Sequence, residues 1–189
     1  MKVLLADQND ERAEALARHL ADAGVDDVAR VAEGERLVDA VKRHAPDVVI
    51  VDMGRADRDG LEPIREVTAR EPKPIVMFAD SSDFAFMEEA IAAGVSSYNV
   101  RGASLPDVKP IVQAAVAIFR RYRKMADDLH AAETKLDEQA VVLRAKSLLM
   151  RERDMSEPNA YKWLRQRAMD RGKRIADVAR ELLAVRNQE

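Results

Sequence analysis

Short apolar runs alternate with helical patterns in the amino-terminal part of the chain. The apolar runs are Val3–Ala6, Val28–Val31, Val48–Val51, Ile75–Phe78 and Ser97–Val100. Between them, apolar side chains recur at helical spacing in Glu11–Ala23, Glu35–His44, Leu61–Arg70 and Phe84–Ala93. Strands that alternate with helices of this length form βαβ units, so the pattern predicts an α/β fold with a doubly wound, five-stranded parallel sheet. The continuous run Val48–Val51 fits a central strand that is buried on both faces.

A heptad pattern extends from Val108 to about Arg151, without glycine and with Pro110 as its one proline. Its repeating positions are Ile111, Ala115, Ile118, Tyr122, Met125, Leu129, Ala132, Leu136, Gln139 and Leu143. About 44 residues at 1.5 Å each predict a helix on the order of 65 Å long. The far part of such a helix needs another surface for its apolar seam. A parallel homodimeric coiled coil supplies one, with Gln139 as a polar seam position, and packing on the carboxy-terminal helices is the alternative.

Two short helical patterns follow. Ser156 precedes a helix predicted from Glu157 to about Asp170, Arg171-Gly172 ends it, and a last helix is predicted from Ile175 to about Val185. With the end of the long helix they predict a small three-helix bundle. The expected inward residues are Ala145, Leu148, Leu149, Met150, Ala160, Tyr161, Leu164, Ala168, Met169, Val178, Ala179, Leu182 and Leu183.

The charge of the chain is divided between these parts. The net charge of −3 is the sum of −8 over residues 1–139 and +5 over residues 140–189. A uniformly basic nucleic-acid coat is thereby excluded, whereas an acidic body with a basic tail domain is not. The absence of cysteine excludes disulfides, thiol catalysis and zinc–thiolate sites. Because the early apolar run Val3–Ala6 is too short for a signal peptide or a membrane span, we expect a soluble cytoplasmic protein.

Two aspartates end neighbouring predicted strands. Asp7 follows the first strand and Asp52 ends the third, at the carboxyl edge where open α/β sheets place their chemistry. Two carboxylates brought together can hold Mg²⁺, and a carboxylate beside that metal can accept a phosphoryl group. The alternative is that both residues are polar only because they lie at strand ends.

These residues belong to a larger pattern. Val3-Leu4-Leu5-Ala6-Asp7, Asp52 with the later Asp59-Gly60, and Gly94-Val95-Ser96-Ser97-Tyr98 resemble a response-regulator receiver domain over roughly residues 1–118. The resemblance implies that Asp52 is the phosphoacceptor, that Asp7 and Asp52 form the Mg²⁺ site, and that Tyr98 is an aromatic switch position.

The chain departs from the receiver pattern at three positions. Gln8 replaces the usual second acid, Phe78 stands where a switch hydroxyl is expected, and Arg101-Gly102 replaces the usual Lys-Pro. Gln8 lacks the negative charge that favours Mg²⁺, Phe78 cannot hydrogen-bond a phosphoryl oxygen, and Arg101 keeps the cation in a planar, bulkier form. We therefore expect a degenerate receiver that is controlled by a protein partner, with no required cofactor, in which Asp52 is not the physiological switch.

The carboxy-terminal module concentrates cations. Its basic residues include Arg144, Lys146, Lys162, Arg165, Arg167, Arg171, Lys173 and Arg174. Such a face neutralises phosphates with salt-sensitive affinity. Tyr161 and Trp163 are candidates for stacking on bases, or else for core or dimer packing. Composition does not separate RNA from DNA, because two short helices across Arg171-Gly172 also suggest a helix-turn-helix.

A second resemblance covers about residues 140–185. It is carried by Ala145-Lys146-Ser147-Leu148-Leu149-Met150, Ser156-Glu157, Ala160-Tyr161, Leu164-Arg165, Arg167-Ala168-Met169-Asp170 and Asp177-Val178-Ala179, which resemble the ANTAR RNA-binding domain of transcription antiterminators. Val51-Asp52-Met53, Asp57-Arg58-Asp59 and Met77-Phe78-Ala79-Asp80-Ser81-Ser82-Asp83 are similar to the nitrate-assimilation (NasT-type) antiterminators.

These resemblances imply a receiver-like domain over residues 1–118, a coiled-coil linker over 119–143 and an ANTAR domain over 144–189. The family binds paired hairpins in nascent leader RNA and so prevents a terminator hairpin. NasT-type relatives are inhibited by a nitrate/nitrite-sensing partner protein. The residues expected to contact RNA are Lys146, Tyr161, Arg165, Arg167, Arg171, Lys173 and Arg174.

Two other functions are compatible with the same residues: a DNA-binding response regulator of helix-turn-helix type and a dimeric protein-interaction module. An enzyme is not expected. The three histidines are scattered, no glycine-rich loop is present to cradle a phosphate, and only the acid pair Asp7 and Asp52 offers chemistry.

Overall fold

A computed structural model describes residues 1–7, 9–25, 27–53, 59–80, 82–100 and 108–186 of the chain. The chain forms two compact units, Met1–Arg123 and Lys124–Glu189. Helix α5 (Val108–Arg153) begins in the first unit and ends in the second, so the heptad segment is one continuous helix of 46 residues, as the pattern predicts. The finer division into a linker and a terminal domain at residues 143/144 stays a prediction.

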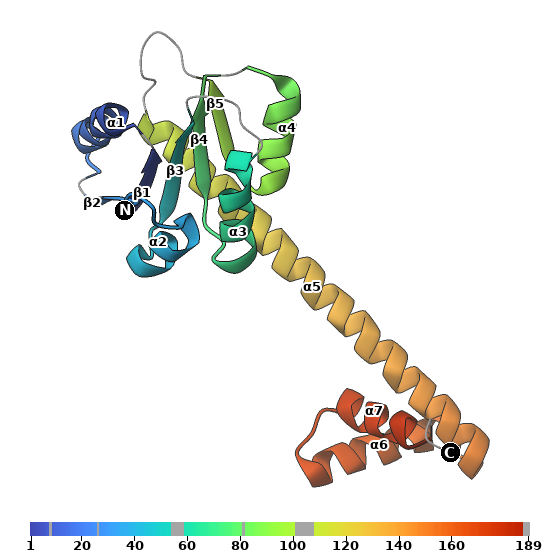
Figure 1. Cartoon of the computed structure of the whole chain (residues 1–189). Helices are drawn as coiled ribbons and strands as arrows, with labels where there is room; N and C mark the ends of the chain where they lie inside the picture. Colours follow the sequence, from blue (N-terminus) through green and yellow to red (C-terminus); the bar gives the residue numbers. More distant parts are fainter. Residues whose placement is uncertain (8, 26, 54–58, 81, 101–107, 187–189) are drawn as a thin grey trace. The chain divides into compact units, whose positions relative to one another are not determined.

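The first unit contains a parallel five-stranded sheet (Figure 1). Its strands are β1 (Lys2–Asp7), β2 (Asp27–Arg30), β3 (Val48–Met53), β4 (Ile75–Ala79) and β5 (Ser97–Val100). Their order in space, β2-β1-β3-β4-β5, is doubly wound and confirms the predicted fold class. Strand β3 is central and buried through its first five residues, as its continuous apolar run predicts.

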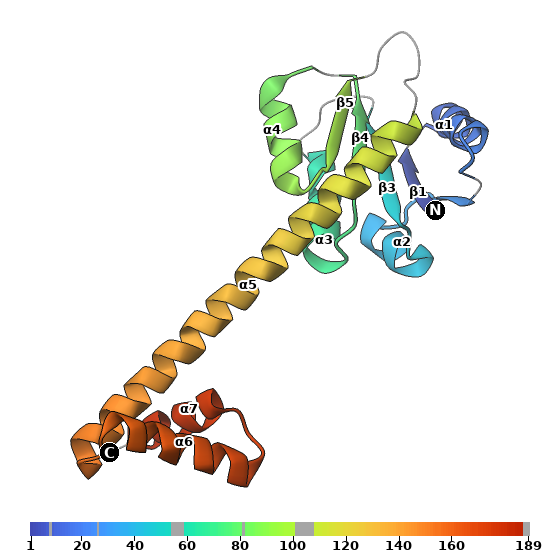
Figure 2. The same ribbon diagram turned by 180° about the vertical axis from the view of Figure 1, so that it is seen from behind.

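Helices cover both faces of the sheet. Helices α2 (Leu37–His44), α3 (Glu62–Arg70) and α4 (Phe84–Ala93) pack on one face, with a short 3₁₀ turn at Asp59–Leu61 before α3. Helix α1 (Asp10–Asp22) and the start of α5 pack on the other, and α5 is seen in front of the strands in Figure 2. The two apolar layers follow the alternation of side chains along each strand. They hold the carboxyl ends of β1 and β3 side by side.

Local signals set the helix boundaries. The Asn9 side chain accepts a hydrogen bond of 2.9 Å from the Arg12 backbone N–H and so caps α1. Asp83 caps α4 in the same way, and Gly94 ends that helix with φ of +112°. The capped first turn of α1 fixes the backbone of Arg12 beside the end of β1.

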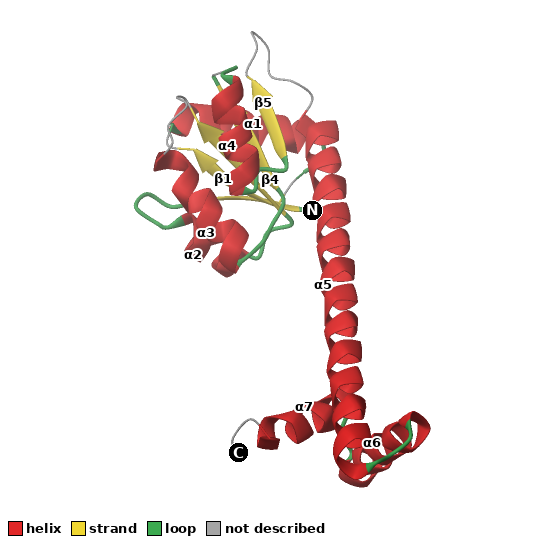
Figure 3. Cartoon of the chain, turned by 90° about the vertical axis from the view of Figure 1, so that its right-hand side faces the viewer, coloured by secondary structure: helices red, strands yellow, loops and turns green. Residues whose placement is uncertain are grey.

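The second unit is helical (Figure 3). It consists of the rest of α5, α6 (Glu157–Arg171) and α7 (Ile175–Arg186), and Gly172 ends α6 in the left-handed conformation. Ala145, Leu149, Ala160, Leu164, Ala168, Val178 and Ala179 form its buried core. This confirms the three-helix bundle. The expectation that Tyr161, Met169 and Met150 also point inward is wrong, because 45%, 66% and 40% of their surfaces are exposed.

None of the helices in the described part of the chain combines the length and the apolar character needed to cross a membrane.

Candidate functional site

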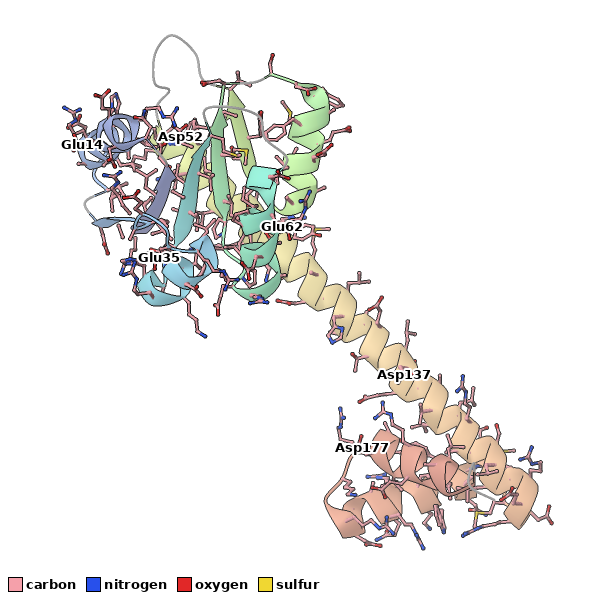
Figure 4. All side chains as sticks on the ribbon, in the orientation of Figure 1. Glu14, Glu35, Asp52, Glu62, Asp137 and Asp177 are labelled. Carbon is pink, nitrogen blue, oxygen red and sulfur yellow. The ribbon has the colours of Figure 1, made fainter. Side chains whose placement is uncertain are left out.

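The acidic pair lies at the carboxyl edge of the sheet. Asp7 and Asp52 are register neighbours on β1 and β3, so the structure brings them together (Figure 4 labels Asp52). Both are shielded from solvent: the Asp7 side chain is fully buried and Asp52 is 8% exposed. A pocket at this edge is lined by both aspartates, Arg12, Met53 and Asp59, among others.

An arginine that the sequence patterns did not single out occupies this edge. The Arg12 guanidinium donates from Nη2 to Asp7 Oδ1 at 2.8 Å and from Nε to Asp7 Oδ2 at 3.3 Å. The Asn9 backbone N–H donates to the same Oδ1 at 2.8 Å. The hydrogen bond to Asp7, with the nearby charges of Asp52 and Asp80, holds the pKa of Arg12 above its ordinary value.

This arrangement does not fit a Mg²⁺ site. Both oxygens of Asp7 already accept hydrogen bonds from Arg12. Gln8, where the receiver pattern has a second acid, lies outside the described residues.

The structure describes two of the three predicted switch positions, Phe78 and Tyr98. Phe78 lies beside Asp52 in the sheet and is 1% exposed, packed in the core on the side of α1 and α5. Strand β4 continues to Ala79, so neither residue at its end carries a hydroxyl. Tyr98 packs edge-on against Phe86 of α4, with ring centroids 6.2 Å apart, and burial, followed by the charge of Asp83, raises its pKa. Arg101 lies outside the described residues.

Most of the predicted RNA-contacting cations carry an acidic partner within the second unit. Lys146 Nζ lies 2.6 Å from Glu157 Oε1, and this contact holds the pKa of Glu157 below its ordinary value. Arg171 and Lys173 both pair with Glu181, whose pKa is lowered mainly by the hydrogen bond from Lys173. These acidic partners were not predicted from the sequence.

The turn between α6 and α7, and α7 itself, form further ion pairs with α5. Arg174 bonds Asp177 at 3.1 Å and Glu138 at 2.6 Å, and its pKa is raised chiefly by the hydrogen bond to Asp177. Arg180 bonds Asp177 at 3.0 Å and Asp137 at 3.3 Å, two carboxylates labelled in Figure 4. The side chains of these pairs are 29–68% exposed, so each pair stabilises the bundle only weakly.

A groove of about 930 Å³ crosses the same surface between α5 and α6 and ends at the start of α7. Tyr161 and Arg165 of α6 line it, one helical turn apart, opposite Lys146 of α5. Lys173 and Arg174 close one end. Five of the seven predicted contact residues therefore share one groove, and Arg167 and Arg171 do not line it. Within the described part of the bundle, Arg165 makes no ion pair.

Trp163 occupies a different position. It packs on the bundle core, and the guanidinium carbons of Arg153 and Arg167 lie 4.9 and 4.5 Å from its ring centroid. The Arg167 guanidinium therefore makes a cation–π contact with Trp163 and does not line the groove. Of the two open interpretations of Trp163, core packing is the one that matches this environment.

The heptad seam of α5 is exposed over most of its length. Ala115 is buried against the sheet, whereas Ile118, Tyr122, Met125, Leu129 and Leu136 are 57–70% exposed. Gln139 and Leu143 line the groove beside α6. Thus only the last seam positions lie next to the carboxy-terminal helices, and the apolar seam from Ile118 to Leu136 faces solvent in the single chain.

Comparisons with known proteins identify both parts. The model of the response regulator receiver domain matches residues 3–108 and that of the ANTAR domain residues 130–183. The transcriptional regulatory protein PdtaR of Mycobacterium tuberculosis is 33% identical over 171 residues, which cover 89% of this chain and 83% of PdtaR. A protein-glutamate methylesterase/protein-glutamine glutaminase of Haloarcula marismortui is 31% identical over 83 residues, 44% of this chain and 22% of that protein, and this match concerns its receiver domain alone.

Solved structures agree on the fold. The signal receiver domain of the response regulator NarL from M. tuberculosis aligns with a TM-score of 0.51 and 21% identity, covering 60% of this chain and 94% of that domain. A response regulator from Thermotoga maritima aligns with a TM-score of 0.52 and 18% identity, covering 61% of this chain and 97% of that protein.

Proposed function

This chain belongs to the response regulators that join a receiver domain to an ANTAR domain, and from that premise we propose that it is a transcription antitermination regulator that binds paired hairpins in nascent leader RNA. ANTAR regulators bind RNA, and the two domains are those of a regulator rather than of an enzyme. The observation that carries the proposal is the groove in which Tyr161 and Arg165 lie beside Lys146, Lys173 and Arg174.

The chemistry of this groove suits a structured RNA loop. Unpaired loop bases can stack on an exposed aromatic ring such as Tyr161, while neighbouring phosphates contact cations. Arg165 is available for such a contact, and its planar guanidinium can bind a phosphate through two hydrogen bonds. In this proposal Lys146, Lys173 and Arg174 exchange their carboxylate partners for phosphates, so we expect binding to depend steeply on salt. Arg167 and Arg171 are weaker candidates because neither lines the groove.

We further propose that the active form is a parallel homodimer joined along the exposed seam of α5. A dimer presents two grooves, one for each hairpin of a pair. Linking two binding sites raises the effective concentration of the second hairpin without any new contact. The exposed Ile118–Leu136 seam supports this proposal, because water-exposed apolar heptad positions are stabilised by burial against a second helix.

The signal that controls this protein is proposed to come from a protein partner. Receiver domains interact with sensor partners. The resemblance to NasT-type antiterminators favours a nitrate/nitrite-sensing inhibitor and nitrate-assimilation genes as the targets. An acidic edge that already holds an internal cation, next to a strand end without a hydroxyl, supports control by binding rather than by phosphorylation.

Replacing Arg165 by alanine is expected to weaken RNA binding by at least about 1 kcal/mol, roughly fivefold, because a charge-assisted contact is lost. The slope of log affinity against log salt concentration should also become shallower by about one. Titration of a labelled two-hairpin RNA at several salt concentrations measures both. Lys162→Ala is the matched control, since Lys162 is exposed on the same helix but does not line the groove. Equal affinities for Arg165→Ala and wild type would remove Arg165 from the interface.

Incubation with acetyl phosphate and Mg²⁺ is expected to leave the intact mass of the protein unchanged. Asp7 is engaged by Arg12, and neither Phe78 nor Ala79 can donate a hydrogen bond to a phosphoryl oxygen. Intact-mass spectrometry tests this, with Asp52→Asn as the site control and a phosphorylatable receiver treated in parallel. Near-stoichiometric phosphoryl addition that Asp52→Asn abolishes would contradict the proposal that Asp52 is not the switch.

A further inference from the structure

We infer that Arg12 takes the place of the divalent metal at the acidic edge of this receiver, so that the site carries its own fixed cation and does not bind Mg²⁺. Receiver domains typically use Mg²⁺ at this edge. Here the described residues put a guanidinium on the Asp7 carboxylate instead. This inference concerns the receiver alone and is independent of the RNA-binding proposal.

The contact is a two-point ion pair on a buried acid. Two nitrogens of Arg12 bond the two oxygens of Asp7, at 2.8 and 3.3 Å. The Asp7 side chain is fully buried, whereas that of Arg12 is 33% exposed. A buried carboxylate requires a compensating charge, and Arg12 provides it from the protein itself.

The fold pre-positions this cation. Asn9 caps α1 by accepting the Arg12 N–H, and the Asn9 N–H in turn bonds Asp7. The end of β1 and the first turn of α1 are therefore joined by three mutually supporting contacts. Arg12 thus reaches the acid from a backbone that the cap already constrains, so the contact requires less backbone ordering than it would from a mobile loop.

The electrostatics match those of a metal site. Asp7, Asp52 and Asp80 all stabilise the charged form of Arg12. A guanidinium does not lose its proton in proteins, so the cation is present at every physiological pH. It neutralises this edge without the octahedral geometry or the retained water molecules that Mg²⁺ requires.

Mg²⁺ would have to break this ion pair in order to reach Asp7. One or two carboxylates are its usual protein ligands, and the two oxygens of Asp7 already have donors. Gln8 supplies no charge to compensate. Removal of Arg12 has the opposite consequence: it leaves the buried Asp7 beside Asp52 without its cation, and this is the situation in which a divalent ion is favoured.

Metal binding by the full-length protein tests this inference. Mn²⁺, a spectroscopic substitute for Mg²⁺, is titrated by electron paramagnetic resonance into wild type, Arg12→Ala, Arg12→Ala/Asp7→Asn and the control Arg18→Ala. Arg18 lies on the same helix and, among the residues that the structure describes, bonds only the Glu14 carbonyl. We expect Arg12→Ala to bind Mn²⁺ at least about tenfold more tightly than wild type, the factor that one displaced charged contact represents. Wild type, Arg18→Ala and the double variant should bind weakly and alike.

Thermal unfolding with and without millimolar Mg²⁺ gives a second readout, with KCl added to match the ionic strength. The midpoint of wild type should not respond to Mg²⁺, whereas that of Arg12→Ala should be lowered and should recover with Mg²⁺. Failure of Arg12→Ala to gain Mn²⁺ affinity overturns the inference. If Arg12→Ala does not fold, the Mn²⁺ affinity of the wild-type protein is the test. Millimolar or tighter Mn²⁺ binding that Asp52→Asn abolishes overturns the inference. The absence of such binding supports it.

Discussion

Replacement of Leu129 and Leu136 together by glutamate is expected to convert the dimer into monomers and to weaken binding of a two-hairpin leader RNA by about a hundredfold. Binding of a single hairpin should remain unchanged. Both leucines are exposed on the single chain, at 61% and 66%, and neither lines the groove on the second unit. Their substitution therefore affects the seam without touching the bundle.

Two contributions determine the expected loss of dimerisation and of RNA affinity. Burial of each leucine at a coiled-coil seam contributes about 1.5–3 kcal/mol, and glutamates facing each other across the seam repel. Once the helices separate, the second hairpin no longer binds within the same complex, and the gain from linked sites is lost.

Multi-angle light scattering measures the oligomeric state, and paired titrations with one-hairpin and two-hairpin RNAs measure the affinity. The matched control is His130→Glu/Ala131→Glu, which adds the same charge at exposed, off-seam positions of α5. A double variant that stays dimeric would place the interface elsewhere. A wild type that binds both RNAs with equal affinity would contradict the role assigned to the dimer.

The first unit shows how far hydrophobic patterning predicts a fold. Strand β5 and helix α4 match their predicted bounds, Ser97–Val100 and Phe84–Ala93, because glycine and an acidic cap mark their limits. The other strands differ by a residue or two at their ends, where Asp7 extends β1 and Asp52 and Met53 extend β3. Burial of one face imposes the periodicity of apolar side chains, so the sequence shows this periodicity wherever an element packs against the core.

The candidate sites were only partly predictable from the sequence. The groove unites Lys146, Tyr161 and Arg165, which the family motifs mark. The acidic partners of the groove's other cations were not predicted. Glu138 bonds Arg174, 36 residues away, and no periodic pattern encodes such a pair. Arg12 was also missed, although it lies only five residues after Asp7, and its place in the first turn after a strand-ending acid is a signal that could have been used.

Helical spacing also misplaced some bundle residues. Tyr161 and Met169 fit an apolar stripe, yet both lie largely outside the core that Leu164 and Ala168 fill. When the apolar face of a helix is wider than the core it packs on, the residues at the edges of that face stay exposed. Exposed apolar residues beside cations are typical of a binding surface. The exposure of Tyr161 therefore strengthens its candidacy for stacking, which sequence alone left open.

The second large effect is expected in the choice of nucleic acid. The protein should bind a two-hairpin leader RNA at least about a hundredfold more tightly than duplex DNA of equal length at the same salt concentration. Tyr161 offers a stacking surface that unpaired loop bases can use and that the paired bases of a duplex cannot. Duplex DNA retains only contacts between its phosphates and the basic groove.

One titration shows whether this regulator acts on hairpin RNA. Wild-type protein is titrated against a labelled two-hairpin RNA and a labelled DNA duplex in the same buffer at physiological ionic strength. We predict tight, saturable binding to the RNA, and binding to the duplex only with a Kd of about 10⁻⁶ to 10⁻⁴ M, the range typical of non-specific contacts. Equal or tighter binding to the duplex would contradict it and would favour a DNA-binding regulator, and failure to bind either would favour a protein-interaction module.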